Sequence, residues 1–189
     1  YDGDVIRINS QSGKGGVAFI METYFGYKLP KGMHKEFADV IQALSEKQGE
    51  VAPDQIMDEF KKCYIDKKEP LHYRGSKFED IMDHEEGCTH ATIRYTDHGV
   101  EKSFEATGNG PIDAVLKGLQ EELGIHIKVL DYTEHALGGG AGAQAAAYIH
   151  MLDMTTSKTT FGVGVSSNIT RASIRAIFSA MNRLGIRNQ

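Results

Sequence analysis

Sequence features that are typical of secreted, membrane-bound or nucleic-acid-binding proteins are scarce in this chain. Its 189 residues include no tryptophan, four prolines and only two cysteines, Cys63 and Cys88. Two cysteines are too few for a disulfide framework, and no apolar run is long enough to span a bilayer or to resemble a secretory signal. Lysine and arginine total 21 against 26 acidic residues, so no basic surplus favours nucleic acid or an anionic membrane. We therefore expect a cytoplasmic protein with neither a nucleic-acid nor a membrane partner.

The beginning of the chain also lacks a methionine. Tyr1-Asp2-Gly3 leads directly into the strand-like segment from Val5 to Ile8. We expect from this start that the chain is a piece of a longer protein. The chemistry of the whole protein would then lie partly outside this sequence.

Apolar residues recur at helical spacing in three stretches between residues 14 and 66. Pro53 suits the first turn of the third helix. From Asp66 to Lys77 the chain becomes polar and the helical period ends, so a linker is expected there. We predict a mainly helical linker subdomain over residues 1–75. The three apolar stripes are Val17, Ile20, Met21 and Tyr24; Phe37, Val40, Ile41 and Leu44; and Ile56, Met57, Phe60 and Tyr64.

The remaining residues contain a repeat. Alternation at Ala91, Ile93 and Tyr95 predicts one strand of a hairpin, and the apolar stripe between Pro111 and Gly124 predicts a helix. The same order of three strands and one helix returns about sixty residues later. We predict a pseudo-symmetric (βββα)2 regulatory domain over residues 76–189. The fold class expected for the whole chain is α+β, a small helical subdomain followed by this domain.

Motifs for phosphate binding and for nucleophilic catalysis are incomplete. The segment from Ser12 to Gly16 resembles a phosphate-binding loop, but Ile8 and Gly15 stand where that motif requires Gly and Ser or Thr. A tight entry into the first helix is the favoured interpretation. No Ser, Cys or Lys nucleophile has a recognisable base and orienting partner, so we expect no catalytic residue in this chain.

A group of potential zinc ligands lies just before the hairpin. Imidazole, thiolate and carboxylate can all bind zinc, but the spacing here matches no closed zinc motif. We therefore expect no metal site, and a zinc-dependent enzyme stays open as an alternative. The group consists of His84, Glu85, Glu86, Cys88 and His90.

Two predicted helix starts occupy equivalent positions in the two copies of the repeat. They are residues 108–111 and 164–168. Free N–H groups at the positive end of a helix dipole can hold a carboxylate, although helix capping alone is the simpler interpretation of one such turn. The small residues from Gly138 to Ala147 leave room for an aliphatic side chain near Val129 and Tyr132, unless they serve close strand packing. Together these features indicate a site for a small hydrophobic amino acid where the copies join.

Long motifs that cover nearly the whole chain point to one enzyme family. In the first part they are residues 9–18, Leu29-Pro30 and Glu36-Phe37. In the second part they are residues 108–114, 130–136, 143–148 and 162–164, together with Ala172-Ser173. The first set resembles the segment that follows the catalytic barrel of 2-isopropylmalate synthases. The second set resembles their regulatory domain.

The resemblance implies a homodimeric acyltransferase that condenses acetyl-CoA with 2-oxoisovalerate on a metal-dependent (β/α)8 barrel. Leucine, the end product, would act as the allosteric effector at the C-terminal domain. The barrel, its catalytic groups and its divalent metal would lie outside this chain, which is expected to need no cofactor and to be inactive alone. Carried over motif by motif, the leucine contacts are expected at Gly108, Asn109, Gly110, Pro111, Ile112, Val129, Tyr132, Ala136, Ala143 and Ile169.

The sequence also allows other assignments of the chain. The corresponding domain of citramalate synthase would answer to isoleucine, and homocitrate synthase acts on a longer oxo acid, but residues 9–16 favour the leucine enzyme. A free-standing amino-acid sensor with no enzyme attached belongs to a different class of protein. It would require a natural start near Tyr1.

Overall fold

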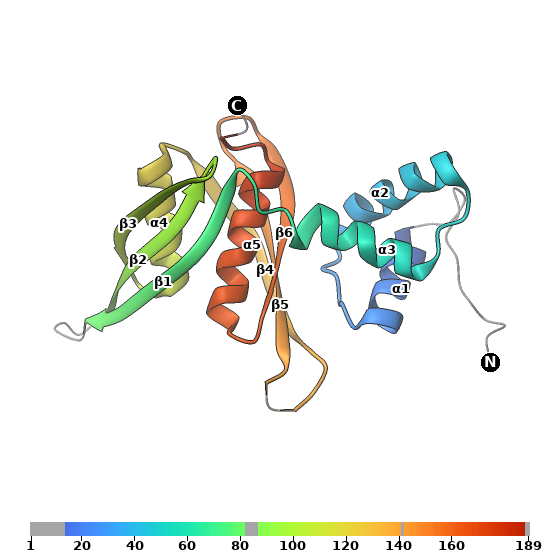
Figure 1. The fold of residues 1–189 in the computed structure, drawn as a ribbon, viewed down its shortest axis with the longest axis horizontal. Helices are drawn as coiled ribbons and strands as arrows, with labels where there is room; N and C mark the ends of the chain where they lie inside the picture. Colours follow the sequence, from blue (N-terminus) through green and yellow to red (C-terminus); the bar gives the residue numbers. More distant parts are fainter. Residues whose placement is uncertain (1–13, 82–86, 141, 188–189) are drawn as a thin grey trace.

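The computed structural model of the chain describes residues 14–81, 87–140 and 142–187, which form three helices followed by two similar units (Figure 1). The three predicted amphipathic helices are present. None of the helices within these ranges is both long and apolar enough to cross a membrane. The helices of the first part are α1 (Lys14–Phe25), α2 (Met33–Gln48) and α3 (Pro53–Phe60), and α3 continues into the π-helical turn Lys61–Ile65.

Each of the two units that follow consists of three strands and a helix. Both sheets are antiparallel, with strand orders β1-β2-β3 and β4-β5-β6. This arrangement confirms the predicted α+β fold and its (βββα)2 repeat. The first unit comprises β1 (Leu71–Ile81), β2 (Cys88–Asp97), β3 (Val100–Gly108) and α4 (Pro111–Leu123). The second comprises β4 (Ile127–Leu137), β5 (Gln144–Asp153), β6 (Lys158–Ser166) and α5 (Ile169–Arg183).

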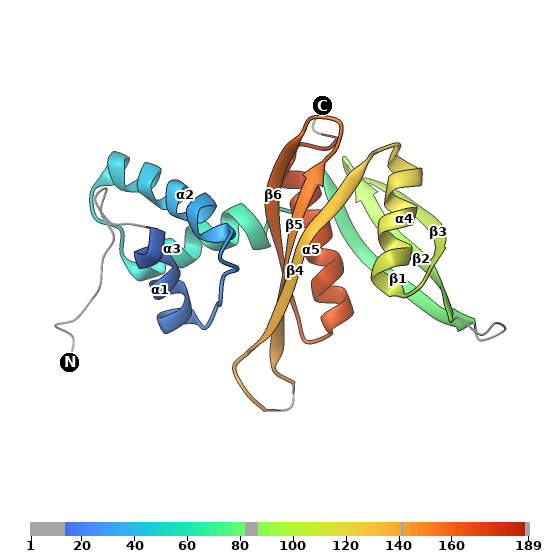
Figure 2. The ribbon, with the colours of Figure 1, turned by 180° about the vertical axis from the view of Figure 1, so that it is seen from behind.

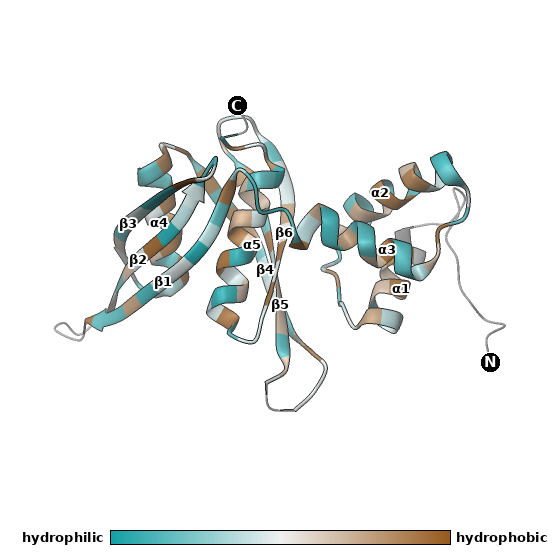
Figure 3. Cartoon of the chain, viewed as in Figure 1, coloured by the Kyte–Doolittle hydropathy of each residue, from teal (hydrophilic) through white to brown (hydrophobic). Residues whose placement is uncertain are grey.

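The helix α5 lies at the centre of the molecule, between the first sheet and the second (Figures 1 and 2). One apolar core joins both units around this helix, and it includes Ile93, Leu119, Ile149 and Ile177. A second core joins α1 to α3 with the opposite face of the second sheet. Apolar and polar residues alternate along α5 and along the helices α1 to α3 (Figure 3).

Strand β5 shows how the second sheet is buried on both faces. Ala147, Ile149 and Met151 belong to the core around α5, whereas Ala146 and Tyr148 belong to the core shared with the helices α1 to α3. A strand covered on both faces has no polar side to alternate with its apolar side. This explains why the sequence of β5 is apolar almost throughout.

The close contact between α5 and β6 leaves no room for a side chain at Gly162 or Gly164. A Cβ at Gly164 would collide with the backbone oxygen of Ala172, and a Cβ at Gly162 would collide with that of Ala176. The facing helix residues are alanines, so the backbones of the helix and the strand approach closely. The glycines of β6 are therefore required by packing.

The structure corrects the expected linker at residues 66–77. Leu71 is fully buried and pairs with Asp97, so residues 71–77 are the first part of β1. The sequence pattern does not reveal this strand, because β1 is an edge strand whose side chains beyond Leu71 are exposed or half-exposed and whose register is irregular between Tyr73 and Gly75. The expected boundary between residues 75 and 76 falls within this strand, and the division into two domains stays a prediction.

The segment between the π-helical turn and β1, residues 66–70, is held by polar side chains of α5. The hydroxyl of Ser179 donates a hydrogen bond to the Tyr64 carbonyl (2.6 Å). The amide nitrogen of Asn182 donates to the carbonyls of Lys67 and Leu71 (2.9 Å each), and its oxygen accepts from the Leu71 N–H (3.0 Å). The end of α5 thus fixes the path of the chain from the helices into β1.

Four side chains from separate elements form a clamp beside this segment, which we call the Glu36 clamp: Glu36, Tyr64, Thr160 and Arg183. The Glu36 carboxylate accepts hydrogen bonds from the Tyr64 hydroxyl (2.6 Å) and the Thr160 hydroxyl (2.8 Å). It also pairs with the Arg183 guanidinium at 3.3 Å, and that guanidinium lies 3.9 Å from the centre of the Tyr64 ring. The clamp joins α2, the π-helical turn, β6 and α5.

We expect Arg183→Met to lower the free energy of unfolding by roughly 1 to 3 kcal/mol, because the half-buried Glu36 carboxylate then loses its cation. Urea unfolding followed by circular dichroism measures the change. Lys35→Met is the matched control, because the Lys35–Asp39 pair lies at the surface with both side chains more than half exposed. It should change stability by less than about 0.5 kcal/mol. Equal effects of the two substitutions would contradict a structural role for the clamp.

Candidate functional site

Tyr132 of β4 connects the second sheet to the first turn of α5. Its hydroxyl lies 2.7 Å from the Ser173 hydroxyl and donates a hydrogen bond to the Glu134 carboxylate. The Ser173 hydroxyl donates to the Ile169 carbonyl (2.9 Å), so the contact reaches the first residue of the helix. The side chains of Tyr132 and Ile169 have exposed fractions of 38% and 40%. Both side chains are therefore open to solvent.

The Tyr132 hydroxyl stays protonated at neutral pH. Partial burial, followed by the hydrogen bond to the Glu134 carboxylate, raises the pKa of Tyr132 to about 12. Both effects favour the neutral phenol, because an ionised phenol would be poorly solvated and would face a carboxylate. The site therefore presents an uncharged hydroxyl beside Ser173.

Three of the predicted contact residues lie on the same face of β4. Val129, Tyr132 and Ala136 pair with Met151, Ile149 and Ala145 of β5. Directly paired residues of antiparallel strands share a face. Met151 and Ile149 belong to the core around α5, so this face of β4 is the one next to α5.

The start of α4 already holds a carboxylate. The N–H of Asn109 donates a hydrogen bond to Asp113 (2.8 Å), whose carboxylate also pairs with Lys117 at 3.0 Å. The Asn109 bond and then the Lys117 bond lower the pKa of Asp113. A leucine carboxylate at this turn would have to share it with Asp113, using N–H groups beyond that of Asn109.

Tight packing also explains the glycine that opens this turn. A Cβ at Gly108 would lie 2.6 Å from both the Ala114 nitrogen and the Asp113 carboxylate. The next glycine, Gly110, precedes α4 with an extended backbone and no side chain to cap the helix. Pro111 begins the helix, and Ile112 packs against the core shared by the two units.

The start of α5 is capped by its own residues. The side-chain oxygen of Asn168 accepts from the Arg171 N–H (2.9 Å), and the Ser166 hydroxyl accepts from the Asn168 N–H (3.1 Å). Capping therefore accounts for part of the polarity predicted for this turn. Of the two helix starts, that of α4 lacks a side-chain cap.

Ala143 lies far along β5 from the other contact residues. It precedes β5 by one residue, whereas Tyr132 pairs with Ile149. Six residues of strand span about 20 Å, which exceeds the length of a leucine molecule. A leucine that touches Tyr132 therefore does not reach Ala143 of the same chain. The assignment of all ten residues to one leucine site stays a prediction.

Ser173 could not be predicted as the partner of Tyr132, because 41 positions separate the two residues and no periodic pattern links them. The position of Asp113 in the first turn of α4 is a sequence signal for its role. An acidic residue in the first turn of a helix is commonly a ligand for that helix's own N–H groups.

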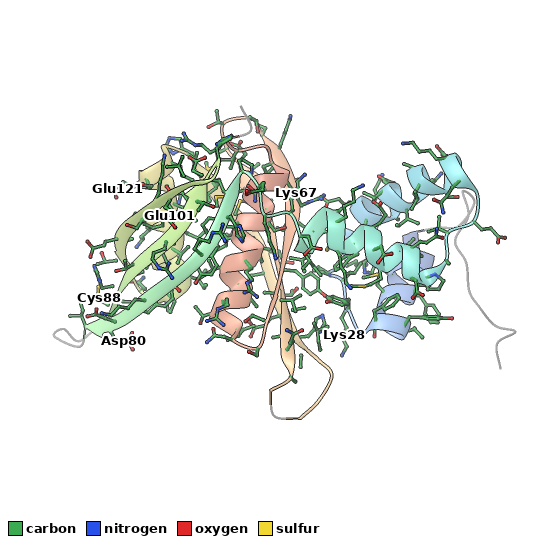
Figure 4. The ribbon with its side chains drawn as sticks, viewed as in Figure 1. Lys28, Lys67, Asp80, Cys88, Glu101 and Glu121 are labelled. Carbon is green, nitrogen blue, oxygen red and sulfur yellow. The ribbon has the colours of Figure 1, made fainter. Side chains whose placement is uncertain are left out.

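The potential zinc ligands before β2 fall partly outside the described residues, which exclude 82–86. Cys88 begins β2 near Asp80 of β1, at the end of the first sheet away from the helices α1 to α3 (Figure 4). His90 pairs with Glu105 at 3.1 Å. Within residues 14–81, 87–140 and 142–187, no three side chains of His, Cys, Asp or Glu are placed to hold a metal ion. Of the segment compared with a phosphate loop, Ser12 and Gly13 also lie outside the described residues, and α1 begins at Lys14.

Comparison with known proteins gives matches along nearly the whole chain. Residues 50–185 match the family described as the LeuA allosteric (dimerisation) domain, and residues 1–22 match the one described as alpha-isopropylmalate synthase, post-catalytic domain-like. Curated relatives named 2-isopropylmalate synthase include those of Clostridium acetobutylicum (42% identical), Brucella suis (38%) and Mycobacterium leprae (40%). Each alignment covers 95% of this chain but only 32%, 32% and 29% of these relatives. The chain thus spans about a third of their length.

Proposed function

The chain belongs to the LeuA allosteric (dimerisation) domain family, and on that premise we propose that it is the leucine-sensing regulatory part of a 2-isopropylmalate synthase. The observation that carries the proposal is the match to 2-isopropylmalate synthases over 95% of the chain. The parent enzyme would be a cytoplasmic acyltransferase that joins acetyl-CoA to 2-oxoisovalerate. The catalytic groups and a divalent metal would belong to parts of that enzyme outside this chain.

Leucine would bind over the face of β4 next to α5. Its isobutyl group would lie against Val129, Tyr132 and Ile169, where the rings and chains are accessible. Its carboxylate would accept hydrogen bonds from the N–H groups of Gly110 and Ile112 at the start of α4, because Pro111 has no N–H and Asp113 already accepts from Asn109. Burial of an isobutyl group contributes roughly 1.5 to 3 kcal/mol, so shape supplies more affinity than charge.

The helix α5 offers a route for the regulatory signal. Its first turn contacts Tyr132 through Ser173, and its last turns hold the segment before β1 and the Glu36 clamp. A ligand that shifts Tyr132 would therefore act on a helix whose other end fixes α2 and the π-helical turn. A regulatory ligand acts only through a difference in its affinity for two arrangements, so leucine must favour one position of α5.

Calorimetric titration of the chain with leucine, isoleucine and valine tests the proposal. We expect saturable binding of leucine and weaker binding of valine, which lacks one methylene. A preference for isoleucine would indicate the regulatory domain of a citramalate synthase instead. Failure of all three to bind would overturn the proposed function.

The chain alone should not condense acetyl-CoA with 2-oxoisovalerate, because the described residues contain no metal-ligand group and the catalytic groups are expected on the barrel outside this chain. Free CoA released from acetyl-CoA, measured with a thiol reagent in the presence of a divalent metal, should match the rate in buffer. The full-length enzyme is the positive control. Release above the buffer rate that requires 2-oxoisovalerate would contradict the prediction.

We expect the chain to form a dimer, and the position of Ala143 supplies a reason within this fold. One chain does not bring Ala143 to Tyr132. A leucine that touches both residues would therefore need the Ala143 of a second copy. Closed two-fold pairs are the commonest way for one chain to complete a shared site. Light scattering should therefore give twice the chain mass of 20.8 kDa.

In that dimer, Ala143→Phe should abolish leucine binding while the fold survives, because the residue is half-buried at the edge of β5 rather than within a core. A monomer at high concentration, or a dimer in which Ala143→Phe binds leucine normally, would count against the shared site.

A further inference from the structure

A cavity lies where the segment leading into β1 crosses α5 and β6. We call it the junction pocket, and its volume is about 150 Å³. None of the ten residues predicted to contact leucine lines it. Its floor includes apolar groups: Leu71 is fully buried, Phe178 is 3% exposed and packs at a tilt against the Tyr73 ring, and Gly164 lies close against α5.

The rim of the junction pocket is positively charged. Lys67 and Lys68 come from the segment before β1, Arg175 comes from α5, and all three are exposed. Arg175 is held in place because its guanidinium donates to the Val165 carbonyl (2.7 Å). Figure 4 shows Lys67 beside α5, on the side that faces the helices α1 to α3. Among the described residues, no Asp or Glu lines this pocket.

His72 also lines the junction pocket, and the pKa of its imidazole depends on burial and on the neighbouring charges. Burial, followed by the charge of Arg74, lowers the pKa of His72, and Lys68 and Arg175 add to the effect. Glu69 opposes them, but the net direction stays downward. His72 thus lies close enough to three cations, Arg74, Lys68 and Arg175, and to one anion, Glu69, to respond to their charges.

We propose that the junction pocket binds a short aliphatic carboxylate that carries no ammonium group. A cavity of this size holds a molecule about as large as benzene, which corresponds to roughly six to eight non-hydrogen atoms. The apolar floor suits the aliphatic part, and the cations of the rim suit the carboxylate, with Arg175 able to bind it through two nitrogens. An α-ammonium group would be repelled by three cations, so amino acids are disfavoured.

The proposed ligand would touch α5 and the segment before β1 at the same time. These are the two elements that Asn182 and Ser179 already join. The site is separate from the leucine site and does not depend on it. A branched oxo acid or hydroxy acid has the required chemistry, whereas leucine does not.

The matched probes are 4-methylpentanoate and leucine, which share one carbon skeleton and differ by the ammonium group. Titration of the chain with 4-methylpentanoate, followed by nuclear magnetic resonance of the His72 ring, should give saturable shifts. Arg175→Gln should weaken this binding roughly tenfold, because a charged hydrogen bond is lost. Replacement of both Lys67 and Lys68 by glutamine should weaken it about threefold or more, because two rim charges are removed.

Lys31→Gln is the control, since Lys31 is exposed on the helical part and does not line the pocket. It should leave 4-methylpentanoate binding unchanged, and none of the variants should alter the affinity for leucine. The double lysine variant keeps the test valid if Arg175→Gln perturbs folding. Absence of saturable shifts at His72, or equal binding by the lysine double variant and Lys31→Gln, would overturn the proposal. Competition between leucine and 4-methylpentanoate would also overturn it, because both would then occupy one site.

Discussion

Tyr132→Ala is expected to weaken leucine binding about a hundredfold, a loss of roughly 3 kcal/mol. The substitution removes the ring that would cover the isobutyl group and also the hydroxyl that contacts Ser173 at 2.7 Å. Because the ring is 38% exposed, its removal should leave the core nearly intact. Calorimetry on the purified variant, with circular dichroism to establish that it is folded, measures the effect.

Two further tyrosine variants separate the possible causes of that loss. Tyr132→Phe keeps the ring and removes only the hydroxyl, so it should weaken binding tenfold at most. Tyr24→Ala removes a ring of similar exposure, 42%, from α1, far along the chain from β4, and should not change leucine affinity. If Tyr132→Ala bound leucine as tightly as the unmodified chain, the site would not lie on this face of β4.

Gly164→Ala is expected to destabilise the fold by roughly 3 kcal/mol or more, which places it among the most damaging single substitutions available here. The added Cβ would collide with the Ala172 oxygen and would lie 2.6 Å from the Ala176 nitrogen. Both are backbone atoms within a helix, so no side chain can rotate away. The midpoint of urea unfolding should fall sharply, and much of the protein should be insoluble at expression temperature.

Gly139→Ala is the matched control for this substitution. It introduces the same methyl group in the loop between β4 and β5, where nothing lies within 4 Å of the new atom. The residue is exposed, so the change should stay within about 0.5 kcal/mol and can be slightly stabilising. A similar loss of stability in both variants would mean that the close contact of α5 and β6 is not what makes Gly164 necessary.

The fold could be predicted largely because its elements are amphipathic. The stripes of α2 and α3 coincide with buried residues such as Phe37, Ile41, Ile56 and Phe60. The stop at Gly124 also agrees with its left-handed backbone, φ 64°. The repeat followed from the order of these elements. Periodicity is informative wherever one side of an element faces a core and the other faces water.

The edge strands β1 and β4 were harder to recognise than the other strands. The side chains of β1 beyond Leu71 and those in the middle of β4 are mostly exposed or half-exposed. Such strands are held in place chiefly by backbone hydrogen bonds to a neighbour, which leave no mark on side-chain pattern. The sequence of β1 therefore looked like a polar linker.

The candidate site, too, could be predicted only in part from the sequence. The glycine-rich turn before α4 was recognisable, since an extended Gly-Asn-Gly-Pro segment before an apolar stripe marks a helix start. The contacts of Tyr132 with Ser173 and of Glu36 with Arg183 were not, because residues 41 and 147 positions apart meet only through the tertiary fold. The distance between Ala143 and Tyr132 likewise required the register of β4 and β5.

The glycines of β6 have a mechanical consequence. With no side chains between them, α5 and β6 cannot slide or tilt against each other without driving one backbone into another. The 15 residues of α5 therefore behave as a stiff rod about 22 Å long, seated on a strand that moves with it. A push on one end of such a rod cannot be absorbed by bending along the way. A displacement of the first turn of α5 would therefore move its last turn by a comparable distance, and Asn182 and Arg183 of that turn hydrogen-bond to the chain before β1.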